Sequence, residues 1–95
     1  NPMPNAHVRH IMVATEEACA ELKAKLEAGE DFAACATKHS KCPTGRRGGN
    51  LGVVKPGQLV AEVDKVVFSG EIRKIHGPVK SEFGYHLIQV LSRID

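Results

Sequence analysis

Aromatic residues are scarce in this sequence, which has no tryptophan, one tyrosine and three phenylalanines among 95 residues. We therefore expect a core built from aliphatic side chains. No apolar run approaches the roughly 18 residues that span a membrane, and no signal peptide is visible, so we expect no membrane partner. The length fits one domain with one modest core, which we place over residues 7–95 after a flexible segment over residues 1–6.

A strong charge imbalance and paired cysteines are also lacking. The net charge of +2 is too weak to indicate nucleic acid as a partner. The densest basic spot, Arg46-Arg47, is expected to lie on a solvated loop. The three cysteines, Cys19, Cys35 and Cys42, form no CxxC pair. An odd count without such a pair argues against a disulfide framework and fits a reducing cytoplasm.

Two histidines each open an apolar run near opposite ends of the chain. His10 alternates in phase with Val8 and Met12, and His86 alternates in phase with Ile88. Because successive side chains of a strand point to opposite faces, each histidine is expected on the apolar face of its strand. If the two strands pair, two imidazoles meet inside an apolar layer. We expect the rings to satisfy each other there, since an unpaired buried polar group is costly.

The order of apolar periods, caps and turns predicts a small sheet with helices packed against it, in the α+β or mixed α/β class. Thr15 and Asp31 are suited to cap two helices, and Gly29 is suited to end the first. The predicted elements are a strand over 7–13, a helix between Thr15 and Gly29, a second helix from Asp31 to near Lys41, a loop over 43–50, a strand over 51–54, a helical stripe from Leu59 to Gly70, a connection over 72–78, a short strand over 79–81 and a last strand over 85–92.

Three interpretations compete for the polar residues around Cys42. One is a cysteine nucleophile with a histidine base, although the neighbouring sequence carries no signature of a cysteine hydrolase. Another is a metal site, because Cys35, His39 and Cys42 have the spacing C-x3-H-x2-C. A fourth ligand is not evident, however, and the apolar helix pattern around Cys35 favours a core position. The third interpretation comes from a family resemblance.

Eight short segments carry this resemblance, in the order and at the spacing of one family. They are His10–Val13, Asp31-Phe32, His39–Pro43, Gly48–Gly52, Gly57–Leu59, Val67-Phe68, Gly77–Val79 and Phe83–Ile88. Through these segments the chain resembles the parvulins, which are rotamase-type peptidyl-prolyl cis/trans isomerases, from about residue 7 to residue 93.

The resemblance implies a four-stranded antiparallel sheet surrounded by four helices, with the first and last strands paired at its centre. It also implies a polar network of His10, Cys42, Ser81 and His86, and a prolyl pocket lined by Leu51, Leu59 and Val63 with Phe83 beside them. Phosphoserine-directed parvulins carry a long basic loop after the first strand and an aromatic residue at the place of Val63. Here only Ala14-Thr15 separates strand from helix, which argues against phosphate dependence.

The expected function follows from the chemistry of the X–Pro bond. This bond prefers trans by only about 0.5–1 kcal/mol but exchanges over tens of seconds, because twisting the amide costs roughly 20 kcal/mol. We expect a monomeric isomerase without cofactor or metal that binds the twisted amide of proline-containing polypeptides better than either planar form. Cys42 is expected to act through its polarity, with covalent thiol attack as the alternative.

Two further alternatives stay open at this point. A non-catalytic chaperone module could use the same groove to hold extended peptides. His10 and His86 could also serve mainly as a buried pair that fixes the sheet, with Ser81 holding their tautomers.

Overall fold

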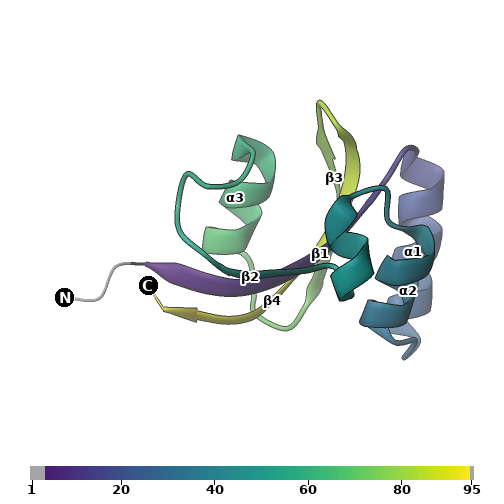
Figure 1. Cartoon of the computed structure of the whole chain (residues 1–95), viewed down its shortest axis with the longest axis horizontal. Coiled ribbons are helices and arrows are strands. Elements are labelled where there is room, and N and C mark those ends of the chain that lie inside the picture. Colours follow the sequence, from purple (N-terminus) through teal and green to yellow (C-terminus); the bar gives the residue numbers. More distant parts are fainter. Residues whose placement is uncertain (1–3, 95) are drawn as a thin grey trace.

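The first and last strands of the chain, β1 (Asn5–Val13) and β4 (Gly84–Ile94), pair antiparallel at the centre of a four-stranded sheet. β2 (Asn50–Val54) pairs with β1, and β3 (Ile75–Ser81) pairs with β4, which gives the order β2-β1-β4-β3. The computed structural model describes residues 4–94 (Figure 1). The predicted α+β class and the central pairing of the first and last strands are confirmed.

Helices pack on both faces of this sheet. α1 (Glu16–Glu27) and α2 (Phe32–His39) cover one face and share a core with Ile11 and Leu87 (Figure 1). α3 (Ala61–Ser69) shares a second core with Val8 and Ile88 on the other face. Neighbouring residues of a strand point to opposite faces, so His10 lies on the same face as Val8. The α3 face therefore carries the candidate site.

The first two helices begin where the sequence predicts. Thr15 Oγ1 accepts the N–H of Ala18 at 3.2 Å, and Asp31 Oδ2 accepts the N–H of Ala34 at 2.9 Å. Each side chain satisfies a backbone donor that has no partner within its helix. Gly29, which follows α1, has a φ of +109°, a backbone conformation that glycine adopts without steric cost.

Two predictions between residues 39 and 50 are wrong in detail. α2 ends at His39 rather than near Lys41, and the segment predicted as an irregular loop contains a short 3-10 helix, η1 (Pro43–Arg47). The residue before a proline is disfavoured in the α region, and both Ser40 and Cys42 have extended backbones. Proline then suits the first position of the new turn because its missing N–H is not needed there. The resemblance implied four helices, and the described residues form three α-helices and the 3-10 helix η1.

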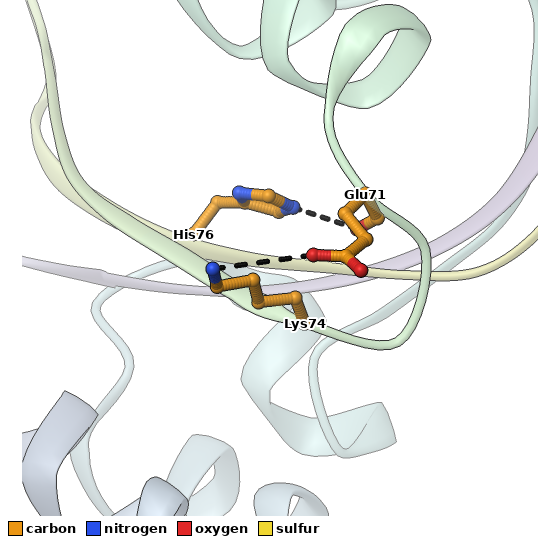
Figure 2. A network of polar contacts seen from close by, with 3 residues as sticks. All are labelled: Glu71, Lys74 and His76. Atoms are coloured by element: carbon orange, nitrogen blue, oxygen red, sulfur yellow. Dashed lines mark hydrogen bonds and ion pairs between the residues drawn. The ribbon is translucent and has the colours of Figure 1, made fainter.

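β3 is longer than predicted and takes in most of the expected connection over residues 72–78. It begins at Ile75, and its pairing with β4 shifts register between His76 and Val79. A proline at position 78 interrupts the ladder because it has no N–H to donate. For this reason the sequence pattern did not predict a strand before residue 79. At the start of β3, the His76 Nε2–H donates to the Glu71 carbonyl at 2.7 Å, and Lys74 Nζ lies 4.0 Å from the Glu71 carboxylate (Figure 2).

The outer boundaries also differ from the predictions. β1 begins at Asn5, and Ala6 is fully buried, so these two residues belong to the sheet and not to the flexible segment predicted over residues 1–6. Residues 1–3 of that segment lie outside the described residues. Leu59 and Val60 precede α3 instead of opening it. Within residues 4–94, no helix has the length and apolar character that crossing a membrane demands.

Candidate active site

His10 and His86 stack against each other on the α3 face of the sheet. The register of β1 and β4 places His10 opposite Ile88 and His86 opposite Met12, which makes the two histidines diagonal neighbours within reach of each other. Their ring centroids are 5.7 Å apart with an angle of 12° between the planes. The residues are 7% and 4% exposed. The prediction that two imidazoles meet inside an apolar layer is confirmed.

The sequence suggested that the two rings satisfy each other, but they do not hydrogen-bond to each other. Each ring contacts a hydroxyl instead. His10 Nε2 lies 3.1 Å from Thr44 Oγ1, and Thr44 Oγ1 donates to Cys42 Sγ at 3.2 Å. The Thr44 hydroxyl therefore links the His10 ring to the Cys42 thiol, with no direct hydrogen bond between the ring and the sulfur among residues 4–94.

His86 is held by Ser81, which lies beside it near the turn of the β3–β4 hairpin. The Ser81 Oγ lies 2.6 Å from His86 Nε2 and also accepts the N–H of Phe83 at 3.2 Å. The Nδ1 atoms of both His10 and His86 are buried without a hydrogen-bond partner among residues 4–94. Since buried polar atoms are rarely left unpaired, the strand pairing holds both rings where they would not settle by themselves.

Burial makes both imidazoles weak bases. Desolvation, followed by the charge of neighbouring His86, lowers the pKa of His10 from 6.5 to about 4. Desolvation also lowers the pKa of His86, partly opposed by the negative charge of Glu62. Both rings are therefore neutral at pH 7, and the pair carries no net charge on the α3 face.

An apolar pocket of about 320 Å³ includes the stacked rings in its wall. Its lining residues are His10, Met12, Cys42, Pro43, Leu51, Leu59, Val60, Val63, Phe83 and His86. Val63 lies at the buried side, with 2% exposure, whereas Phe83 is 60% exposed at the rim. No Lys, Arg, Asp or Glu contributes to the lining within the described part of the chain. The pocket therefore suits a small apolar group.

The structure brings seven of the eight predicted site residues to this pocket. The eighth, Ser81, contacts the ring of His86 and not the pocket itself. Sequence reasoning missed Met12, Pro43 and Val60 of the lining, and Thr44 beside the His10 ring. Met12 had a signal, because it alternates in phase with His10, but Thr44 had none, because its hydroxyl reaches the ring only through the turn of η1.

Gly49 fixes η1 to the strand that carries His10. The N–H of His10 donates to the Gly49 carbonyl, and the N–H of Gly49 donates to the Thr44 carbonyl, each at 2.9 Å. Gly49 has a φ of +79°, and a side chain there would collide with the carbonyl oxygen of His10. Only glycine fits such a conformation and approach. This contact sets Thr44 at hydrogen-bonding distance from the His10 ring.

The other two cysteines lie in the core beside α1 and α2. Desolvation raises the pKa of the Cys19 thiol to about 11. Desolvation and a hydrogen bond to the Glu30 carboxylate raise the pKa of Cys35. Along residues 4–94, no three side chains of His, Cys, Asp or Glu gather as a metal ion would require. The C-x3-H-x2-C spacing thus does not become a cluster there.

Known proteins are similar to this chain in sequence and in architecture. Residues 6–92 match the PPIC-type PPIASE domain of the Rotamase family. The chain is 40% identical over 91 residues to foldase protein PrsA 4 of Bacillus cereus and 38% identical over 96 residues to the chaperone SurA of Burkholderia lata. These matches cover 95% and 92% of this chain but only 32% and 21% of the two relatives. The chain thus spans a third or less of their length.

Solved structures agree with the sequence matches. The crystal structure of the peptidylprolyl isomerase PrsA from Bacillus anthracis has a TM-score of 0.93 at 31% identity, covering 98% of this chain and 43% of that chain. NmPin, the parvuline of Nitrosopumilus maritimus, has a TM-score of 0.87 at 29% identity, covering 97% of this chain and all of that one (100%). This chain belongs to the parvulin family as a PPIC-type peptidyl-prolyl isomerase domain, which confirms the resemblance and the enzyme class.

Proposed function

We propose that this domain accelerates rotation about X–Pro bonds in unfolded or flexible polypeptide segments without forming a covalent intermediate. One observation carries the proposal: the apolar pocket has two neutral, stacked histidines and a thiol in its wall. A twisted amide has lost the charge separation of the planar form, so a desolvated pocket favours the twisted state. In this arrangement Leu51, Leu59 and Val63 hold the proline ring, and Phe83 covers it from the rim.

The hydrogen-bond chain at Cys42 supports a polar role over a nucleophilic one. A nucleophilic thiol needs a neighbouring base to take its proton. His10 does not contact the thiol directly, because the Thr44 hydroxyl lies between them, 3.1 Å from His10 Nε2 and 3.2 Å from Cys42 Sγ. Its pKa of about 4 also makes this ring a poor base at pH 7. Cys42 is thus better placed to adjust the polarity near the substrate carbonyl than to attack it.

The immediate surroundings of the pocket support substrates that are not phosphorylated. A phosphate-directed site needs several fixed cations, and the pocket lining contains none within residues 4–94. β1 ends at Val13, and α1 begins at Glu16 with two acidic residues in its first turn. No basic insertion separates the two elements, so a phosphoserine before proline would meet no dedicated partner there.

A chaperone module that holds extended peptides without catalysis is the second candidate. This candidate is supported by the names of the relatives, a foldase and a chaperone, although those names describe the longer proteins. Two-dimensional NMR exchange on a proline-containing tetrapeptide, measured in the presence of a chelator, separates the two functions. We expect faster cis/trans exchange on adding the domain. Peptide binding with exchange at the uncatalysed rate would favour the chaperone module and contradict the proposed catalysis.

Proline-containing polypeptides are the partner that the enzyme class implies. We further propose that the domain acts as a monomer, which sedimentation velocity tests directly. Location in a reducing cytoplasm stays a prediction from the three thiols, all of which are free. Fractionating the source cells with an antibody against the domain would test that prediction.

A further inference from the structure

Charge is divided unevenly around the prolyl pocket. Residues 32–61, which include α2, η1 and β2, contain five Lys or Arg and no Asp or Glu. The other walls carry both signs: Glu62 and Lys65 lie on α3, and Lys80 and Glu82 lie at the β3–β4 turn. The charge of Glu62 raises the pKa of His86, against the larger effect of desolvation. Cations without acids beside them in the sequence therefore lie on the α2 and η1 side of the pocket.

A second cavity, of about 530 Å³, adjoins the prolyl pocket on the basic side. The two cavities share Cys42 and Pro43 in their walls, so they lie beside each other. Lys41 and Arg46 are the charged residues of its lining. Both are exposed, and within residues 4–94 no ion pair joins either of them to a carboxylate. Their charges are therefore available to a ligand.

We infer that the cavity lined by Lys41 and Arg46 is a subsite for an acidic side chain of the substrate. The inference rests on the proposed function and extends it to sequence preference. Because the prolyl pocket itself has no charged lining residue within the described part of the chain, the residue next to proline meets apolar surface. The two cavities adjoin at Cys42 and Pro43, so the acid of the substrate lies near proline but not next to it, on one side of proline only.

The expected preference is moderate because both cations are exposed. An exposed ion pair is worth roughly 0–1 kcal/mol, which corresponds to less than about tenfold in kcat/KM for each pair. We expect glutamate to exceed glutamine by about fivefold at low salt. This advantage should shrink at high salt because exposed charges are screened.

The test compares two series of otherwise identical peptides. One series carries Glu, Gln or Lys two residues before proline, and the other carries them two residues after it. Exchange rates and dissociation constants are measured by NMR for the wild type, Arg46→Gln and Arg47→Gln. Arg47 is the matched control: it is the next residue, it is also exposed, and it does not line the cavity. Arg46→Glu completes the set by reversing the charge.

The inference predicts a Glu over Gln preference in one series, which falls to near unity in Arg46→Gln and turns in favour of Lys in Arg46→Glu. Arg47→Gln should keep the wild-type preference. Equal kcat/KM and equal binding for Glu, Gln and Lys in both series would overturn it, and so would an equal loss in Arg46→Gln and Arg47→Gln. Failure of the proposed function is separately visible, because the Gln peptide would then not be isomerised at all. The dissociation constants would still report any charge preference in that case.

Discussion

Replacing Ser81 by alanine tests whether the hydroxyl holds His86 in the core. In the wild type, the ring of His86 has one hydrogen bond within residues 4–94, 2.6 Å from Nε2 to Ser81 Oγ, and its Nδ1 is buried without a partner there. Ser81→Ala would leave both ring nitrogens unpaired at a position that is 4% exposed. A buried polar group left unsatisfied costs about 1–3 kcal/mol. Each kcal/mol lowers the Tm of a domain of this size by about 4–8 °C.

Urea unfolding followed by far-ultraviolet circular dichroism measures this change in the free energy of unfolding. Ser92→Ala is the matched control, because Ser92 is an exposed serine of β4, and its loss should cost under about 0.5 kcal/mol. His86→Phe removes both ring nitrogens while keeping a ring, so adding Ser81→Ala to it should cost much less than in the wild type. Equal costs of Ser81→Ala in the two backgrounds would refute the reasoning that the hydroxyl acts through the histidine.

Three other predictions concern pH, the thiol and substrate charge. The folded-state pKa of His10, about 4, lies below its unfolded value of 6.5, so the unfolded chain binds more protons between these values. The free energy of unfolding should fall by on the order of 3 kcal/mol from pH 7 to pH 4, and this part should vanish in His10→Phe; parallel pH curves from urea titrations would contradict it. Cys42→Asp should keep more activity than Cys42→Ala, with no adduct in intact-mass spectra of enzyme and peptide, whereas a trapped acyl species would favour the nucleophile. Phosphoserine-proline should not exceed leucine-proline by a hundredfold in kcat/KM, since the pocket lining holds no cation within the described residues.

Local chemistry allowed much of the fold to be predicted from the sequence alone. The period of two in a strand is a property of the backbone, so the apolar residues in phase with His10 and His86 predicted that each ring lies on the apolar face of its own strand, and the family resemblance predicted that the two strands pair. Helix starts are equally local, because Thr15 and Asp31 each satisfy a donor three residues away. The lining of the pocket by Leu51 and Phe83 was predictable only through the family resemblance, because no local pattern brings these two residues together.

Only the tertiary structure decided how the two rings are held. Register places His10 opposite Ile88, so the imidazoles stack and do not form a hydrogen bond with each other. The partner of His10 is Thr44, which arrives from a turn that the sequence predicted as irregular, and it arrives there because Gly49 bonds to the backbone of β1. Such contacts join residues far apart in the chain, so no hydrophobic period or helix cap within either segment predicts them. The sequence alone determined which face of each strand carries its histidine, because alternation is local, while the packing of the strands and η1 determined which atoms touch.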